Sequence, residues 1–374
     1  MVNHLPGGTV LAEEYAVFGV RRIVRKISSR FSKERERGKM PSIKPSKRAV
    51  SGGQGQGQGQ DAAEPGLSER ALAVAKEELR EDRLSREQAL QQFREWIVKN
   101  QDLENCRTDA NFLLRFLRVK KFSLPMAQQT LLKYLNMRQT FKHLLFDLDA
   151  SLPKVEALID SGYLFASPIR DNHGRRVVIG IGKRMDPSRF TNIDMAKVHC
   201  ITYETLLDDE ENQVMGFTHF ADLEGLSPSC VTLWSPTEFT HCLRWGEQSM
   251  PMRHKQIHFL NLPAPLKYLY DFCRSRFSQK MRTRFLIHDT LDDLRKHVDT
   301  KCLPREYGGD MPMAQMIDLW KEEIASKQKM LLRLDEMKLL SDQGIVTRRT
   351  AASSSNTCTG ISTVTGSFRR LEVD

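Results

Sequence analysis

The stretch from Pro263 to Arg284, PAPLKYLYDFCRSRFSQKMRTR, combines two kinds of side chain that could do chemistry. Five cations fall within its last eleven residues: Arg274, Arg276, Lys280, Arg282 and Arg284. An apolar stripe recurs at helical spacing and is made of Leu266, Leu269, Tyr270, Cys273 and Phe277. A helix of this kind can cover an apolar cavity with one face and bind anions near its end. An ordinary amphipathic surface helix with solvated cations is the alternative.

Residues that could carry catalysis do not assemble into a recognisable set. Residues 180–182, GIG, lack the third glycine of a dinucleotide fingerprint, and no GxSxG nucleophile elbow occurs. His254 and His258 have i, i+4 spacing but fall across a predicted strand entrance without an acidic partner at ligand spacing. Asp222 and Glu224 follow a predicted strand and are expected to cap the next segment. The sequence therefore predicts a protein that is not an enzyme and holds no metal.

The positive charge is concentrated near the start of the chain. The 374 residues carry a formal net charge of +10, and residues 1–50 hold twelve Lys/Arg against four Glu. A nucleic-acid-binding domain usually carries its charge on the folded part, so nucleic acid is not an expected partner. Seven cysteines without a CxxC pair predict a reducing, cytoplasmic compartment. No uncharged apolar run reaches the roughly 18 residues of a membrane-spanning helix, so any membrane contact is expected to be peripheral.

Composition sets two terminal regions apart. Residues 51–60, SGGQGQGQGQ, form a low-complexity linker, and we expect residues 1–65 to be a disordered basic arm and Gly/Gln linker. Residues 20–31 could form a basic amphipathic helix on anionic lipid or an organelle presequence, although flanking glutamates argue against the presequence. The Ser/Thr-rich residues 348–374 are expected to be a disordered tail.

The ordered part is predicted to begin with helices and to continue as an α/β layer. Ser85 with Gln88 forms a capping box, and Ser123 begins a further helix, so residues 66–148 are predicted to be a small helical bundle. Strands and helices then alternate, which predicts a mostly parallel sheet within residues 149–325. The expected elements are strands 163–169 and 176–181, helix 194–207, strand 215–221, helix 236–248, strand 256–261, helix 263–284 and strand 285–288. Residues 326–347 are expected to form a C-terminal helix, and the acidic run 208–211 a solvated loop.

Five short segments occur in the order and spacing of a known family. They are FLLRFLRVKKF at 112–122, DNHGRRV at 171–177, ADLEGL at 221–226, IHFLNLP at 257–263 and LPREYGG at 303–309. On these segments the chain resembles the CRAL-TRIO lipid-binding family, in the branch of alpha-tocopherol transfer protein, cellular retinaldehyde-binding protein and the clavesins. The resemblance spans about residues 85–325. It implies the CRAL-TRIO fold, an α/β fold in which a mobile gate helix lies over an apolar cavity and a helical bundle precedes the sheet.

The resemblance also implies a basic cleft. Shuttle members of the family bind phosphoinositide headgroups beside the gate, and the corresponding cations here are Lys120, Arg253, Lys255, Lys280 and Arg284, with Arg282 adjacent. A bisphosphorylated inositol carries several closely spaced charges, which convergent cations suit. The gate helix positions are Leu266, Leu269, Tyr270, Cys273 and Phe277.

The cavity is less clearly specified. His199 and Tyr203 lie one helical turn apart where the resemblance places polar groups that contact the cargo, and they are bulkier than the small hydroxyl residues of the tocopherol carrier. Hydrogen bonding within the core is the alternative role for both. The apolar candidates are Phe165, Ile179, Ile181, Phe220 and Leu243, together with Leu269, Tyr270 and Phe277 from the gate. No cofactor is expected other than a bound hydrophobic lipid.

The implied function is that of a non-enzymatic carrier. It would enclose one small hydrophobic lipid, such as a retinoid or tocopherol, and exchange it at phosphoinositide-containing membranes. The expected protein is a cytoplasmic monomer that binds endosomal or Golgi membranes peripherally. The alternative is a phosphoinositide-sensing regulatory or trafficking module that transfers no cargo.

Overall fold

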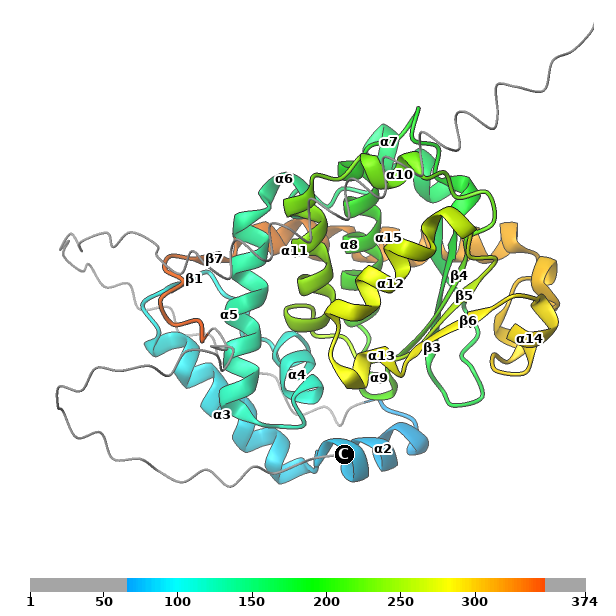
Figure 1. Cartoon of the computed structure of the whole chain (residues 1–374). Coiled ribbons are helices and arrows are strands. Elements are labelled where there is room, and N and C mark those ends of the chain that lie inside the picture. Colours follow the sequence, from blue (N-terminus) through cyan, green and yellow to red (C-terminus); the bar gives the residue numbers. More distant parts are fainter. Residues whose placement is uncertain (1–65, 347–374) are drawn as a thin grey trace, which may run out of the picture.

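The structure is a computed structural model that describes residues 66–346 (Figure 1). Within the helix over residues 236–248, the side chains of residues 236, 237, 240, 243 and 244 lie outside the description. The predictions for residues 1–65 and 348–374 also fall outside it. In the part of the chain that is described, no helix is both long enough and apolar enough to cross a membrane.

An aromatic core joins two of the N-terminal helices, α4 (Ala110–Val119) and α5 (Leu124–Thr140). The other N-terminal helices are α2 (Glu69–Leu79), α3 (Arg83–Lys99), α6 (Lys142–Leu145) and α7 (Pro153–Asp160). Phe112, Phe116 and Tyr134 meet edge to face with ring centroids 5.3–6.3 Å apart. The predicted capping box at Ser85 is wrong, because Asp82 is the N-cap of α3 and its side chain accepts from the Ser85 amide.

A five-stranded sheet forms the second part of the molecule. Its strands are β2 (Leu164–Ala166), β3 (Arg176–Ile181), β4 (Phe217–Asp222), β5 (His254–Leu260) and β6 (Phe285–His288), which lie side by side in this order. The edge strand β2 runs antiparallel to β3, and the other three pairings are parallel. This confirms the predicted α/β class with a mostly parallel sheet.

Helical crossovers join the parallel strands, as parallel pairing requires. They contain α8 (Asn192–Leu207) and α9 (Glu210–Met215), then α10 (Ser229–Thr232) and α11 (Pro236–Gln248), then α12 (Lys267–Arg276) and α13 (Gln279–Arg282). After β6 come α14 (Leu291–Arg295) and the long α15 (Met313–Arg333), and α15 packs against α7, α8 and β2.

The C-terminal part departs from the helix expected over residues 326–347. α15 ends at Arg333, and a short strand, β7 (Lys338–Leu339), then pairs antiparallel with β1 (Leu103–Glu104). The pairing brings the end of the described chain back to the N-terminal helices (Figure 1). A two-residue strand is too short for a periodic pattern, so this pairing could not be predicted from the sequence.

Candidate lipid-binding cavity and basic cluster

A cavity of 440 Å³ lies between the sheet, α8, α11 and the segment from α12 to α13. This volume is within the roughly 300–1,000 Å³ of small-molecule sites. The sheet supplies a mostly apolar floor made of Leu164, Val178, Gly180, His219, Ala221, Ile257, Phe259 and Phe285. A second hollow of 250 Å³ shares His199, Tyr203 and Trp234 with it, so the two spaces adjoin. The cavity can enclose a small apolar molecule.

Two polar groups of side chains interrupt the apolar wall. One nitrogen of His199 lies 3.0 Å from the Tyr163 hydroxyl and the other lies 3.2 Å from the Tyr203 hydroxyl. Nε2 of His219 lies 2.9 Å from Nδ1 of His254. Burial lowers the pKa of both His199 and His254 to about 4. These imidazoles are therefore neutral at neutral pH, and they hydrogen-bond without placing charge in the cavity.

The structure separates the predicted cavity residues into two groups. His199, Tyr203, Ile181 and Phe220 line the cavity, although the Phe220 ring also packs edge-on against Tyr307 with centroids 5.0 Å apart. The side chain of Leu243 lies outside the description.

Phe165 and Ile179 are corrections to the prediction. They are fully buried partners in the β2–β3 register, and side-chain alternation directs them to the face opposite Leu164 and Gly180. Neither residue lines the cavity, because Leu164 and Gly180 occupy the cavity face.

The helix predicted to form the gate is interrupted, and each of its helical parts is shorter than expected. A 3₁₀ turn over Ala264–Leu266 precedes α12, and Phe277 is extended between α12 and α13 with φ −80° and ψ 157°. Ser278 then caps α13 by accepting from the Met281 amide. The single helix predicted over 263–284 is therefore wrong. The serine was the available signal for a new helix start.

The apolar side of the gate nevertheless faces the sheet. The Phe277 ring stacks on Phe285 with centroids 5.1 Å apart, and Tyr270 meets Phe259 edge-on at 5.9 Å. Leu266 is buried against Val231, with Leu269 beside them. The remaining gate position, Cys273, is half-buried. Phe277 and Met281 also line the cavity, so this segment forms one of its walls.

Four predicted cations gather beside α13. Arg253 and Lys255 lie at the start of β5, Lys280 lies on α13, and Arg284 precedes β6. Burial lowers the pKa of each of these four cations. Repulsion adds to the shift, because Arg284 and Arg253 both act on Lys280, and Arg253 acts on Lys255. Cations that repel one another at close range form a site that favours anion binding, because a bound anion relieves the repulsion.

Arg175 is a further member of this group that the sequence interpretation missed. Its charge acts on Lys255 and Arg284, and its guanidinium donates to Gln256 Oε1 at 3.2 Å. The residue lies in the DNHGRRV segment just before β3, and β5 and β6 bring the other cations to it across the sheet. Hereafter, the basic cluster means Arg175, Arg253, Lys255, Lys280 and Arg284.

The other two predicted cations have different surroundings. The charges that act on Lys120 are those of Lys133 and Glu247, whereas Lys121 acts on Lys280. Arg282 donates to the carbonyl oxygens of Phe277 at 2.9 Å and Ser275 at 3.0 Å. Arg282 thus ties α13 to the end of α12.

An acidic residue from the N-terminal helices lies against the basic cluster. Oε2 of Glu78, on α2, accepts from Arg253 at 2.5 Å and from Lys255 at 2.8 Å. Burial favours the neutral acid, but the two cations outweigh it and lower the pKa of Glu78. Its side chain is still 46% exposed. Glu78 is an internal counter-ion for two of the five cations.

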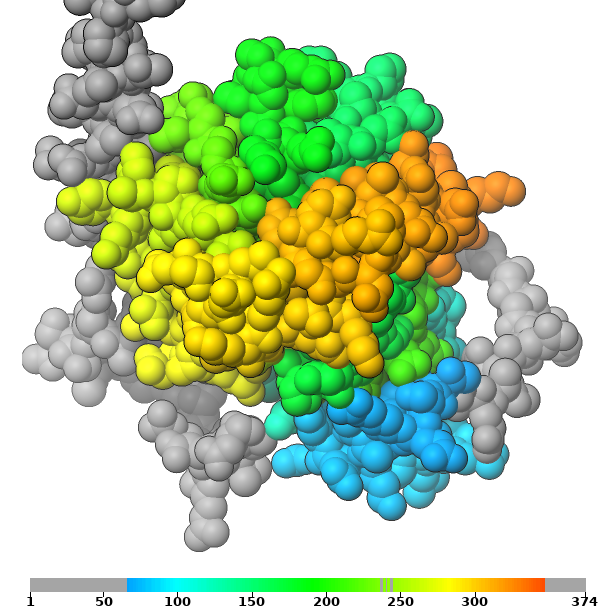
Figure 2. Space-filling model, turned by 90° about the vertical axis from the view of Figure 1, so that its right-hand side faces the viewer, coloured from blue at the N-terminus to red at the C-terminus, as the bar shows by residue number. Residues whose placement is uncertain are grey.

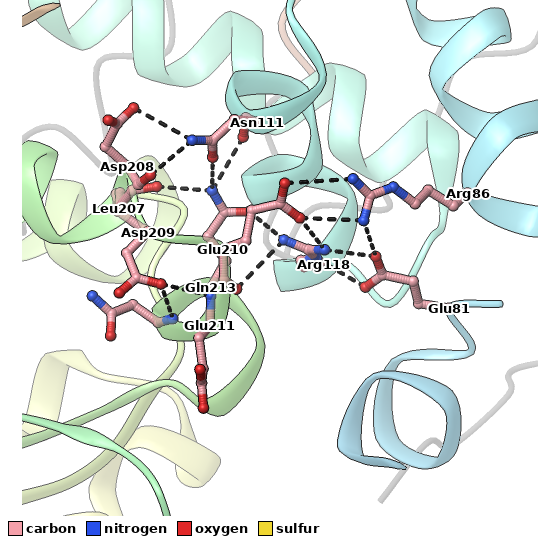
Figure 3. Close-up of polar contacts among 11 residues, drawn as sticks. Glu81, Arg86, Asn111, Arg118, Leu207, Asp208, Asp209, Glu210, Glu211 and Gln213 are labelled. Carbon is pink, nitrogen blue, oxygen red and sulfur yellow. Dashed lines mark hydrogen bonds and ion pairs between the residues drawn. The ribbon is translucent and has the colours of Figure 1, made fainter. Parts of the chain in front are cut away.

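A buried polar network joins the N-terminal helices to the sheet domain (Figure 3). Arg118 on α4 is fully buried and donates two hydrogen bonds to Glu81, at 2.7 and 2.8 Å. It also donates to Glu210 at 2.8 Å and to Gln213 at 2.9 Å, both on α9. The solvated loop predicted over residues 208–211 is wrong, because Glu210 belongs to this network and Asp209 caps α9.

Comparison with known proteins agrees with this architecture. Residues 160–309 match the family model described as "CRAL/TRIO domain", and residues 82–155 match "Pinta-like, UBA domain". Clavesin-1 of Xenopus laevis is 29% identical over 252 residues, covering 67% of this chain and 76% of that protein. Clavesin-2 of Homo sapiens is also 29% identical over 252 residues, covering 67% and 77%.

A solved structure titled "Crystal structure of Sfh5" aligns with a TM-score of 0.43 and 13% identity, covering 68% of this chain and 99% of that chain. The family models and the two clavesins confirm the resemblance found in the sequence. Residues 160–309 of the chain are therefore assigned to a CRAL/TRIO domain.

Proposed function

We propose that this protein is a non-enzymatic carrier that encloses one small hydrophobic lipid and exchanges it at phosphoinositide-containing membranes. The observation that carries the proposal is the position of α13. Met281 on this helix lines the cavity, and Lys280, the preceding residue, belongs to the basic cluster. An anionic headgroup bound by Lys280 would therefore act directly on a wall of the cavity.

The cargo is a molecule with an apolar body. The cavity wall is formed mainly by aliphatic and aromatic side chains, and its histidines are neutral. A charged cargo would lose its hydration without gaining an ionic partner there. A retinoid, a tocopherol or a lipid of similar size fits these conditions. Native mass spectrometry of the purified protein, followed by lipid extraction, tests whether such a molecule is bound and identifies it.

The gate is tested by Phe277→Asp. The ring stacks on Phe285 and contributes to the cavity wall, so it is an apolar group that can enter the headgroup region when the gate opens. Placing a large apolar side chain in a membrane contributes about 1.5–3 kcal/mol, so we expect transfer to acceptor vesicles to slow by about tenfold or more. The control is Phe277→Leu, which keeps an apolar side chain and should retain most of the activity. Equal transfer by the Asp variant and the wild type would contradict the gate.

The role of Glu78 is tested by Glu78→Gln. Removing this carboxylate releases Arg253 and Lys255 for an external anion. A basic group near an anionic leaflet contributes about 1 kcal/mol, so affinity for vesicles with phosphatidylinositol bisphosphate should rise about fivefold. Glu77→Gln is the matched control, because Glu77 is the preceding residue on α2, is also exposed and carries the same charge. Equal gains in both variants would mean that net charge alone matters, and Glu78 would then have no specific role.

A further inference from the structure

Three histidines and an aspartate gather where β6 ends and α14 begins. His288 is the last residue of β6, and the side chains of Asp293 and His297 come from α14 and the residues just after it. His258 on β5 lies against His288, with Nδ1 of His258 2.9 Å from Nε2 of His288. Its neighbours Ile257 and Phe259 line the cavity, so alternation directs His258 to the opposite face of the sheet. The group is therefore separate from the lipid cavity.

We propose that His288, Asp293 and His297 bind a divalent transition-metal ion, with Zn²⁺ as the best match. The candidate ligand atoms of these three residues all lie within 4.8 Å of one another. Two imidazoles and a carboxylate are the ligands that Zn²⁺ takes in three-ligand protein sites, where water fills the fourth position. A set of only three protein ligands at the surface leaves that position open.

The backbone holds the ligands in suitable positions. Asp293 and His297 are four residues apart, and the His297 amide donates to the Leu294 carbonyl in a helical turn, so both side chains point to one side. Oδ2 of Asp293 is 2.8 Å from Nδ1 of His288, and the rings of His288 and His297 are 5.2 Å apart. Zinc bonds of about 2.1 Å place tetrahedral ligand atoms roughly 3.4 Å apart. Small rotations of the exposed His297 and the half-exposed Asp293 reach this geometry.

His258 lies next to His288, in a position to fix the orientation of the His288 ring. A metal-bound histidine usually donates its other ring N–H to a nearby acceptor, which fixes the ring. With the ion on Nδ1 of His288, Nε2–H of His288 donates to Nδ1 of His258. Both rings are buried and stacked, with planes 20° apart. Within the described residues, Nε2 of His258 has no hydrogen-bond partner. Burying it costs free energy, so core stability alone does not account for this histidine stack.

The neighbouring cation Lys296 does not contact the Asp293 oxygen that would bind the ion. Nζ of Lys296 lies 4.0 Å from Oδ1 of Asp293, whereas Oδ2 is the oxygen that faces His288. α14 lies on the side of the molecule that Figure 2 presents. His297 is exposed, so an ion can reach the site from solvent. A bound ion would join the end of β6 to α14. It would stabilise the folded state in proportion to the logarithm of the ion concentration relative to Kd.

The experiment titrates the tag-free full-length protein, stripped with a chelator, with Zn²⁺ and with Co²⁺. We expect one ion per chain, Co²⁺ absorption bands typical of four-coordinate nitrogen and oxygen ligands, and a rise in Tm with Zn²⁺. His297→Ala and Asp293→Ala should each weaken binding by about tenfold or more and remove the Tm rise. Both side chains are at least partly exposed, so these variants are expected to fold.

The matched control is His143→Ala. His143 is an exposed histidine beside one carboxylate, with Nε2 3.0 Å from Glu238 Oε1. This variant should bind the ion as the wild type does. The proposed site is overturned if His297→Ala binds Zn²⁺ as tightly as the wild type does. Equal Zn²⁺ affinity of Asp293→Ala and the wild type would also contradict it.

Discussion

Reversing two charges of the basic cluster, by Lys280→Glu with Arg284→Glu, should abolish salt-sensitive binding to vesicles that contain phosphatidylinositol bisphosphate. The two side chains act on each other and on Arg253, so they belong to one electrostatic unit. The change amounts to four charge units. At about 1 kcal/mol for each basic group near an anionic surface, the expected loss is about 4 kcal/mol, or roughly a thousandfold in affinity. Vesicle co-sedimentation at several salt concentrations measures it.

The control variant makes the same charge change on another part of the surface. Lys329 and Arg333 are exposed on α15, which packs against α7, α8 and β2 rather than against α13. Lys329→Glu with Arg333→Glu should therefore bind vesicles almost as the wild type does. Arg284 donates to the His254 carbonyl, so Lys280→Glu alone provides a second test if the double variant does not fold. Wild-type binding by a folded Lys280→Glu, Arg284→Glu variant would exclude the basic cluster as the docking site.

The sequence predicts the sheet well because the pattern that indicates each strand and each crossover helix lies within a short stretch of the chain. Apolar strands separated by crossover helices specify parallel pairing, and β3 to β6 pair as expected. The same pattern does not say which face of the sheet encloses the cavity. Phe165 and Ile179 are as apolar as Leu164 and Val178, and only the packing of α8, α11 and the gate distinguishes the two faces.

Charged side chains were harder to interpret. The cations of FLLRFLRVKK have the spacing of a surface helix, yet Arg115 and Arg118 are fully buried. Their carboxylate partners are distant in the chain: Glu204 lies 89 residues from Arg115, and Glu81 lies 37 residues from Arg118. Arg175 was missed for the same reason, since Lys255, Gln256 and Arg284 lie 80, 81 and 109 positions further along the chain. Spacing along a helix carries no information about such partners.

The histidine cluster shows a related limit. Spacing along the chain relates His258 to His254 and indicates no acidic partner for either. The residues that gather around it, His288 and Asp293, are 30 and 35 positions further along and reach it because β5 and β6 end side by side. Parallel strands bring their carboxyl ends to one edge, and side chains that meet there have no fixed spacing in the sequence.

Replacing Arg118 should produce the largest loss of stability. Arg118→Met removes a fully buried guanidinium and leaves Glu81, which is 7% exposed, with only the longer contact to Arg86 at 3.6 Å (Figure 3). Breaking a buried ion pair on one side costs about 3–5 kcal/mol, because a charge remains in a poorly solvated place. Urea unfolding followed by circular dichroism measures the change. Arg83→Met is the matched control, since Arg83 pairs with Glu87 on the surface of α3, and it should cost about 0.5 kcal/mol or less.

A double variant distinguishes the effect of the Glu81 carboxylate that remains after Arg118→Met from the effect of the lost Arg118 packing. If the remaining carboxylate causes the loss, Arg118→Met with Glu81→Met should be more stable than Arg118→Met alone. A loss below about 1 kcal/mol in Arg118→Met would contradict the role of this network as the main junction. The junction also bears on function, because Glu81 follows α2 by two residues and α2 carries Glu78. The same buried arginine that secures the N-terminal helices therefore holds a counter-ion over the basic cluster.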